Sequence, residues 1–222
     1  MKIALFNTYT ADYEELAKLT IANHKEYCDR HGYFYHVIKE NCPYMPDFMF
    51  LRFPHLIKLF QDYDYDYIHF SGIDTLIMNY TIKIEDWIDK DYHFQLAKET
   101  SGGYRALNSD VFIVKNSPEG LGILKFIHSK MEIYKHRHWQ EQAVMIDYFG
   151  HPELRDYIKI MPQQSFNSYP WKYYDQNQSG HADIHKGEPG DFKLGDFLLH
   201  APGHTMANRL RIWAEFLPQV IK

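Results

Sequence analysis

The chain has 222 residues, of which 45% are hydrophobic, 24% charged and 17% aromatic, and this predicts one globular domain with a sizeable core. The formal net charge is −5 and there is no long basic run, so we do not expect nucleic acid as a partner, because phosphate contacts need clustered Lys and Arg. No apolar stretch approaches the ~18 residues of a membrane span, and the first residues lack the apolar core of a signal peptide, so we expect a soluble, cytoplasmic protein or a soluble domain of a larger one.

Cysteine and tyrosine usage narrows the chemistry further. Cys28 and Cys42 form no C-x-x-C pair, so a cysteine-based zinc site is unsupported. Two free thiols in a reducing compartment are the default, with a disulfide between them as the alternative. The 18 tyrosines fit either a tyrosine-rich core and surface or a cleft whose rings stack on sugars or bases.

The first forty residues predict a strand, a helix and a second strand. Residues 3–6 form an apolar strand that ends at residues 7–10, and Asp12-x-x-Glu15 resembles a capping box. A helix should follow, with Leu16, Leu19, Thr20, Asn23 and Tyr27 on one face and Gly32 as its end. Residues 33–38 are rich in β-branched and aromatic residues. This βαβ pattern favours a parallel sheet in an α/β domain.

The next elements lead to an isolated acid. Residues 41–47 should be a loop, and residues 53–63 a helix that begins near Pro54. Residues 67–70 then read as a buried strand, which breaks at Ser71-Gly72 and is followed by Asp74 and the apolar residues 76–78. Because ligands of open α/β sheets bind beyond the carboxyl ends of the strands, we expect Asp74 in any active site, with a helix N-cap or turn-former as the structural alternative.

The remaining elements are predicted from the same kinds of pattern. We expect a short helix or turn at 84–88, strands at 93–97, 111–114, 157–161 and 197–200, helices at 118–134, 138–149 and 205–217, a flexible loop at 101–103, and a long functional loop at 162–191. The second half is thus irregular. Ser117 should cap the helix that follows it.

A second polar group follows the predicted strand at 197–200. That strand delivers His200 to its carboxyl end, where Pro202-Gly203 turns the backbone. Histidine with a carboxylate is a plausible pair of metal ligands, and glycine lets a backbone N–H approach a phosphate. The alternative for His200 is a hydrogen-bonded core histidine.

Other polar clusters are weaker signals. Asp62, Asp64 and Asp66 have Asp-x-Asp spacing, but they precede their strand, so we interpret them as a solvated connection. Asn108-Ser-Asp110 before a strand and Trp139-Gln-Glu-Gln142 at a helix start could each place polar groups in a cleft, or be ordinary loop and capping sequences. Residues 136–138 are expected to form a surface cluster.

In this order, the pieces resemble glycosyltransferases with the GT-A fold, most of all family 34, the fungal and plant α-galactosyl-, α-mannosyl- and xylosyltransferases. The matching stretches are residues 31–33, 67–79, 108–117, 139–142, 166–170 and 195–203. The resemblance implies a Rossmann-like, mixed, mostly parallel central sheet flanked by helices. It also implies one domain over residues 1–222, with a nucleotide-binding half at about 1–100 and an acceptor half at about 101–222.

The resemblance also implies a cofactor and site residues. It implies a nucleotide-sugar donor, UDP-hexose first and a guanosine-linked sugar second, Mn²⁺ or Mg²⁺ as cofactor, a glycan or glycoprotein acceptor, and retention at the anomeric carbon. Asp74 and His200 match the metal ligands. The donor-binding positions would be Asn7, Thr8, Tyr9, Arg52, Ser71, Gly72, Ile73 and Gly203, and the catalytic positions Glu141, Asp110, Asn108 and Gln142, with Glu141 the first candidate to stabilise an oxocarbenium-like state.

The sequence departs from the family at two positions. Gly72 replaces the first acid of the Asp-x-Asp motif, and Asp110 stands where the family usually has glycine. The membrane anchor common in the eukaryotic family is absent from this sequence, as in a bacterial or viral enzyme or an excised domain. We therefore carry three alternatives: a metal-independent transferase on the same fold, a non-catalytic nucleotide-sugar-binding module, and a metal-dependent phosphohydrolase.

Overall fold

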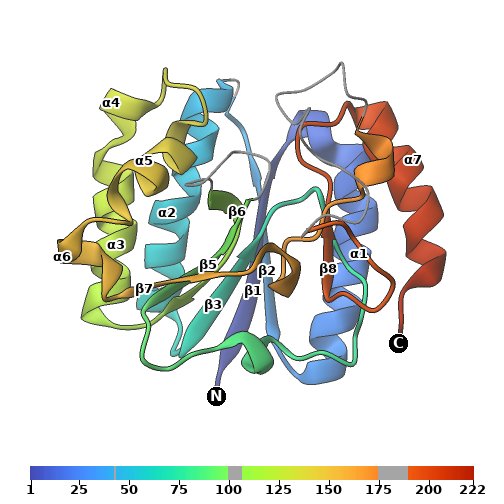
Figure 1. The fold of residues 1–222 in the computed structure, drawn as a ribbon, viewed down its shortest axis with the longest axis horizontal. Coiled ribbons are helices and arrows are strands. Elements are labelled where there is room, and N and C mark those ends of the chain that lie inside the picture. The colour runs from blue at the N-terminus through green and yellow to red at the C-terminus, as the bar shows by residue number, and fades with distance from the viewer. Residues whose placement is uncertain (43, 100–106, 175–189) are drawn as a thin grey trace.

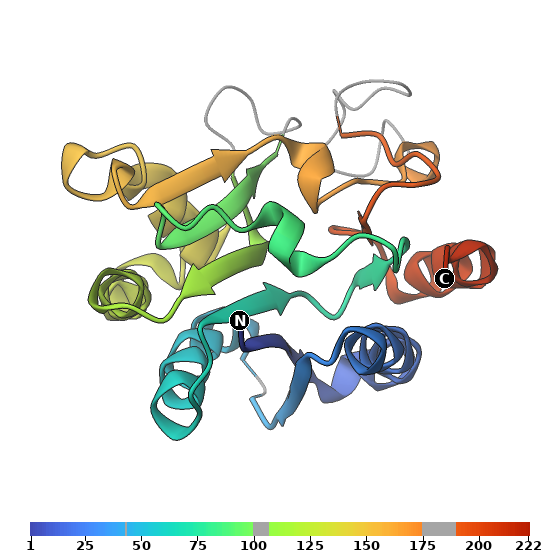
Figure 2. The ribbon, with the colours of Figure 1, turned by 90° about the horizontal axis from the view of Figure 1, so that it is seen from below.

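A six-stranded sheet with helices on both faces forms the centre of the molecule (Figures 1 and 2). The computed structural model describes residues 1–42, 44–99, 107–174 and 190–222. The strand order is β2-β1-β3-β6-β5-β7, and β4 and β8 form a separate two-stranded sheet. The strands are β1 (Ile3–Thr10), β2 (Phe34–Glu40), β3 (Tyr67–Ser71), β4 (Thr75–Ile77), β5 (Phe94–Lys98), β6 (Leu107–Lys115), β7 (Ile158–Met161) and β8 (Leu198–His200).

The direction of β6 decides where the polar residues meet. β1 runs parallel to β2 and β3, and β5 parallel to β7, whereas β6 is antiparallel to both β3 and β5. Ser71 at the end of β3 therefore lies opposite Val111, and the backbone N–H of Gly72 donates to the carbonyl of Asp110 at 2.7 Å. The start of β6 thus lies at the carboxyl ends of β1 and β3. The mixed, mostly parallel α/β sheet that the sequence predicts is confirmed.

The helices divide between the two faces of the sheet (Figure 2). The α-helices are α1 (Glu14–His31), α2 (Met45–Asp62), α3 (Pro118–Ser129), α4 (Met131–Tyr134), α5 (Gln140–Tyr148), α6 (Pro152–Arg155) and α7 (Met206–Phe216). The apolar residues of α2, α3 and α5 pack with Phe6, Phe70 and Phe112 on one face. The other face, with Leu5 and Ile113, packs against Tyr27 of α1 and Phe197. Neighbouring residues of one strand alternate between these two cores, as strand geometry requires.

The helix α1 ends as predicted but begins differently. Gly32 follows it in the left-handed conformation, at φ 70°, and its N–H bonds to the carbonyl of Cys28. No side chain caps the start, because the chain enters α1 through a 3-10 turn at Ala11–Tyr13, so the predicted capping box is wrong. Leu19 was also placed on the wrong face, since it is 38% exposed.

The helix α2 is longer than predicted. It begins at Met45, with Pro46 in its first turn, and Pro54 lies inside it. The prediction took Pro54 as the helix start, but the interior of a helix can contain proline when the lost hydrogen bond is outweighed by packing. Phe50, Phe53 and Leu56 on this helix are fully buried.

The later elements follow the prediction with shifted ends. Residues 84–87 form a 3-10 helix, and the helix expected over 118–134 divides at Lys130 into α3 and α4. Ser117 caps α3 by accepting from the Gly120 N–H. The helix expected from residue 138 begins at Gln140, because the preceding residue, Trp139, has the left-handed conformation, at φ 67°. The loop predicted at 101–103 and residues 175–189 of the long loop lie outside the described residues.

Candidate active site

Asp74 lies in the turn between β3 and β4, and hydrogen bonds from several elements fix that turn. The Thr75 hydroxyl donates to the carbonyl of Gly72 at 2.7 Å, and Thr20 of α1 donates to the carbonyl of Ile73 at 2.8 Å. The N–H of Ala201 donates to the carbonyl of Asp74 itself at 3.0 Å. The carboxylate is therefore held at the carboxyl end of β3.

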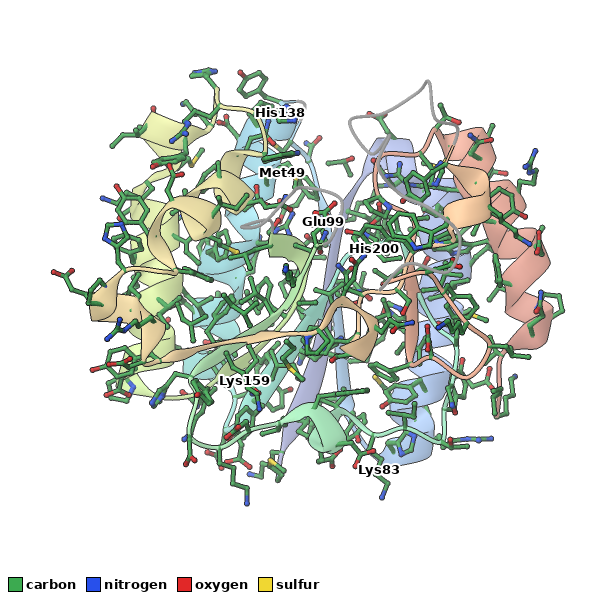
Figure 3. All side chains as sticks on the ribbon, in the orientation of Figure 1. Met49, Lys83, Glu99, His138, Lys159 and His200 are labelled. Carbon is green, nitrogen blue, oxygen red and sulfur yellow. The ribbon has the colours of Figure 1, made fainter. Side chains whose placement is uncertain are left out.

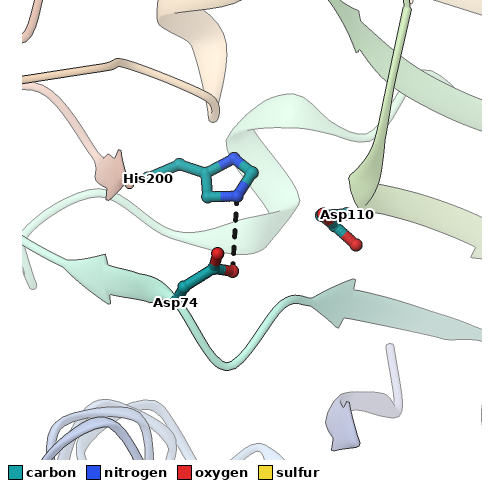
Figure 4. A group of neighbouring side chains, drawn as sticks. All are labelled: Asp74, Asp110 and His200. Atoms are coloured by element: carbon teal, nitrogen blue, oxygen red, sulfur yellow. Dashed lines mark ion pairs between the residues drawn. The ribbon is translucent and has the colours of Figure 1, made fainter. Parts of the chain in front are cut away.

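His200 faces Asp74 from the end of β8, across the β4–β8 pair (Figure 4). Its Nδ1 lies 2.7 Å from Oδ1 of Asn167, and an amide oxygen only accepts, so Nδ1 carries the proton. The other ring nitrogen, Nε2, is buried, has no hydrogen-bond partner, and lies 3.4 Å from Oδ1 of Asp74. An unpartnered imidazole nitrogen facing a carboxylate oxygen is an arrangement that a cation between them would satisfy.

Asp110 completes a group of three possible ligands. One ligand atom from each of Asp74, Asp110 and His200 lies within 4.8 Å of the other two. Two carboxylates and an imidazole suit a divalent ion such as Mn²⁺, so the donor set fits the cofactor that the sequence motifs imply. The sequence analysis placed Asp74 and His200 here as ligands, but assigned Asp110 to catalysis.

Two buried arginines hold the outer oxygens of the two carboxylates. Arg52 of α2 donates from Nη1 to Oδ1 of Asp110 at 2.8 Å, and Arg209 of α7 donates from Nη2 to Oδ2 of Asp74 at 2.8 Å. Burial acts to raise the pKa of Asp74, but the nearby positive charge of Arg209 opposes it and the carboxyl pKa lies below its ordinary value. Asp74 is therefore ionised at neutral pH.

Asp110 lines two neighbouring cavities and Asp74 lines the first of them, whereas the fully buried His200 lines neither. The first has a volume of about 190 Å³ and is lined by Thr8, Tyr9, Tyr13, Phe48, Met49, Arg52, Phe70, Gly72, Ile73, Asp74, Asp110, Pro202, Gly203 and Arg209. The second, of about 300 Å³, is lined by Met49, Glu99, Asn108, Ser109, Asp110, His138, Trp139, Gln140, Glu141, Gln142, Pro202 and Gly203. Asp110 and Gly203 line both. Figure 3 places Met49, Glu99, His138 and His200 toward one end of the sheet, with Lys83 and Lys159 toward the other.

Most predicted donor-binding residues line the first cavity. They are Thr8, Tyr9, Arg52, Gly72, Ile73 and Gly203. Asn7 and Ser71 are not among the lining residues, because their side chains are used below it: Asn7 donates to the carbonyl of Ser71 at 2.5 Å and accepts from Tyr35, and the Ser71 hydroxyl pairs with Thr75 at 2.7 Å. These two residues support the cavity floor instead of facing it.

The predicted catalytic residues meet at the second cavity. Asn108 bonds to the Tyr169 hydroxyl at 3.0 Å, and its Oδ1 accepts from the N–H of Asp110 at 2.9 Å. Gln142 accepts from the Ser109 N–H at 3.2 Å, so α5 is tied to the start of β6. His138, expected on the surface, also lines this cavity.

Glu141 is completely buried beside Arg52. Its Oε1 accepts from the Ser109 hydroxyl at 2.7 Å and lies 3.7 Å from Arg52 Nη2, while Oε2 has no hydrogen-bond partner. Burial raises the pKa of Glu141 to about 7, against the lowering effect of Arg52. A carboxyl group poised near neutrality is suited to electrostatic or proton-transfer roles.

Two residues of the site, Arg209 and Asn167, were not predicted from the sequence. Arg209 lies in the first turn of α7, where the helix dipole disfavours a cation, and that position is a signal of a nearby acid. Asn167, which fixes the orientation of the His200 ring, lies in the matching stretch 166–170, but that stretch was given no role in the site.

The Asp-x-Asp spacings before β3 have the structural role that was predicted. The side chain of Asp64 is 91% exposed and pairs with Lys2 at 2.8 Å. The backbone N–H of Lys2 donates to Asp66 at 2.7 Å. Both acids lie at the amino end of β3, opposite the site.

Comparisons with known proteins show a family match over part of the chain and a shared fold. Residues 3–100 match the galactosyl transferase GMA12/MNN10 family. The chain is similar to a solved glycosyltransferase involved in the glycosylation of the major capsid of PBCV-1, at 17% identity and a TM-score of 0.74, with 97% of this chain and 100% of that chain covered. The glycosyltransferase GlyE of Streptococcus pneumoniae TIGR4 is 13% identical with a TM-score of 0.62, over 97% of this chain and 60% of that chain. No curated protein sequence matches.

A third similar structure is the galactosyltransferase LgtC, solved with donor and acceptor sugar analogues, at 13% identity and a TM-score of 0.61, over 99% of this chain and 96% of that chain. The chain therefore has the GT-A fold of these glycosyltransferases. Within that class it is similar to family 34, over the residues that the family match covers. Among the described residues, no helix combines the length and apolarity needed to cross a membrane.

Proposed function

We propose that this protein transfers a hexose from a nucleotide sugar, UDP-hexose in the first instance, to a glycan hydroxyl, with retention and with Mn²⁺ as cofactor. The supporting observation is the buried, unpartnered Nε2 of His200, which faces Asp74 at 3.4 Å beside Asp110. The cation would be held by Asp74 and His200 and would neutralise charge on the leaving diphosphate. LgtC, with its donor and acceptor analogues, is a precedent for such a reaction on this fold.

The two cavities suggest how the substrates divide. The first contains Tyr9, Tyr13 and Phe48, whose rings can stack on a base, together with Arg52 and Arg209 for the diphosphate. The second contains Asn108, Glu141 and Gln142, which can bind sugar hydroxyls. Asp110 and Gly203 line both, so the anomeric carbon would lie near that shared wall. We likewise propose that the half at about residues 1–100 binds the nucleotide and that the half at about residues 101–222 binds the acceptor.

We propose that Glu141 stabilises positive charge on the sugar. Both Glu141 and the alternative carboxylate, Asp110, lie beside Arg52, but Arg52 is closer to Asp110, at 2.8 Å against 3.7 Å, and Oε2 of Glu141 has no hydrogen-bond partner. The acceptor hydroxyl would then attack from the face of the departing phosphate, whose oxygen takes the proton. Proton NMR of the first product formed tests this, because retention predicts the same anomeric configuration as in the donor.

The test of the function is transfer or donor hydrolysis with a panel of UDP-hexoses and Mn²⁺. Asp74→Ala and His200→Ala should each lower the rate by at least about 100-fold, since each removes a proposed ligand of the cation that stabilises negative charge on the leaving diphosphate. Asp64→Ala and His151→Ala are matched controls on exposed residues. Wild-type rates in both site variants would contradict the assignment of the site.

A metal-independent transferase is the second candidate, and Arg52 and Arg209 favour it. Two guanidinium groups on the wall of one cavity can offset a diphosphate without a cation. Activity that resists EDTA would support this candidate. UDP binding without any transfer or hydrolysis would instead support a binding module, and release of inorganic phosphate a phosphohydrolase.

A further inference from the structure

The glycine at position 72 is not required by the backbone. Among the described residues, the glycines with positive φ are Gly32, Gly190, Gly195 and Gly203, so Gly72 has a conformation that other residues adopt. What a side chain at position 72 would meet is a pair of carboxylates. A Cβ there would lie 2.9 Å from Oδ1 of Asp74 and 3.3 Å from Cβ of Asp110.

Asp110 reaches this space from the neighbouring strand. Gly72 and Asp110 are bonded backbone to backbone at 2.7 Å, so their Cα atoms are cross-strand neighbours. Arg52 holds Oδ1 of Asp110 at 2.8 Å, which leaves Oδ2 for another partner. The unpartnered Nε2 of His200 belongs to the same group of atoms, within 4.8 Å.

We propose that Asp110 is the third protein ligand of the cation site, and that positions 72 and 110 together accommodate one carboxylate and not two. A second acid at position 72 would crowd Cβ of Asp110 and repel both existing carboxylates. With glycine at 110, the contacts with the Asp110 side chain are gone, and the contact that remains, with Oδ1 of Asp74, is with the end of a side chain that can shift. This inference rests on the cation of the proposed function. It adds Asp110 as a ligand, and it says that an acid at position 72 can replace Asp110 only when residue 110 is glycine.

The test measures Mn²⁺ affinity directly, by electron paramagnetic resonance titration with UDP present, and needs no acceptor or turnover. Asp110→Asn keeps an oxygen that accepts from Arg52 but removes the charge, and should weaken Mn²⁺ binding about 10- to 100-fold, as should Asp110→Gly. Gly72→Asp alone should also weaken it. The double variant Gly72→Asp, Asp110→Gly should regain most of the affinity that Asp110→Gly loses.

Gly150→Asp is the matched control, because a Cβ there meets nothing within 4 Å and the change adds the same charge. Thermal unfolding of each variant shows that it is folded. If Gly72→Asp alone does not fold, Asp110→Asn and the double variant still decide the matter. Unchanged affinity in Asp110→Asn, or a double variant no better than Asp110→Gly, overturns the inference while the proposed function stands. Absence of Mn²⁺ binding by the wild-type protein overturns both.

Discussion

Burial and the nearby charge of Arg52 act in opposite directions on the pKa of Glu141. Its carboxyl has no contact with solvent, one of its oxygens has no hydrogen-bond partner, and Arg52 is its nearest cation. Because burial disfavours the charged form more than Arg52 favours it, the carboxyl pKa is about 7 in the folded protein, against an ordinary value of 4.5. Ionising this group therefore costs stability.

This balance predicts a pH-dependent gain in stability for Glu141→Gln. The folded pKa is raised, so the contribution of Glu141 to stability is complete below about pH 4.5 and is lost as the pH rises through about 7. At about 1.4 kcal/mol per pKa unit, the loss at pH 8 is on the order of 3 kcal/mol. Urea unfolding should find the variant equal to wild type at pH 4.5 and more stable at pH 8. A difference that does not change with pH would refute the balance, and Glu153→Gln on the surface is the control.

At the scale of elements, the N-caps of α3 and α7 offer a matched comparison. Ser117 accepts from the Gly120 N–H at 3.1 Å, and Thr205 accepts from the Asn208 N–H at 3.3 Å. Of these two helices, only α7 carries a residue of the candidate site in its first turn: Arg209, which donates to Asp74 and to the carbonyl of Ala201. Both caps use a hydroxyl oxygen, although the Ser117 hydroxyl also bonds to Nδ1 of His93 at 2.7 Å.

We predict that Ser117→Ala and Thr205→Ala each lower the free energy of unfolding by about 1 kcal/mol. Thr205→Ala should also weaken UDP binding several-fold, because fraying of the first turn of α7 frees Arg209. Urea unfolding and calorimetric titration of UDP measure the two effects. Equal loss of UDP affinity in both variants would show that the α7 cap has no special link to the site.

The central strands and most helices could be predicted from the sequence, because their apolar periodicity is strong. The start of α2 could not, since Pro54 is a helix-start signal wherever it occurs and only packing reveals it as an interior residue. Nor could the position of Asp110 beside Asp74: it depends on β6 running antiparallel to β3, and a strand's direction is set by its connections and not by its own residues. Asp74 and His200 could be placed in the site from the sequence, because each lies at or just beyond the end of a buried strand.

At the scale of the whole molecule, the two Asp–Arg pairs of the site balance each other's charge before any ligand binds. Asp74 and Asp110 are each paired with an arginine, so a divalent cation added alone would leave two positive charges uncompensated in a largely buried place. A diphosphate would neutralise them. Cation and nucleotide should therefore bind cooperatively.

We predict that UDP tightens Mn²⁺ binding by about tenfold or more, and that Mn²⁺ tightens UDP binding by the same factor. Calorimetric titration of each ligand in the absence and presence of the other measures both factors. Uridine, which lacks phosphates, should give no coupling and serves as the control. Equal Mn²⁺ affinities with and without UDP would mean that the site's charge is balanced in some other way.

The pairing of β4 with β8 has a consequence for folding. β4 ends at Ile77 and β8 begins at Leu198, and the chain returns once more when the Ile221 N–H binds the carbonyl of Met78. Such contacts between distant parts of the sequence close large loops and form slowly. His200 meets Asp74 only through them, so during synthesis the βαβ unit at residues 3–40 can form early, whereas the site must wait until residues 198–221 have left the ribosome.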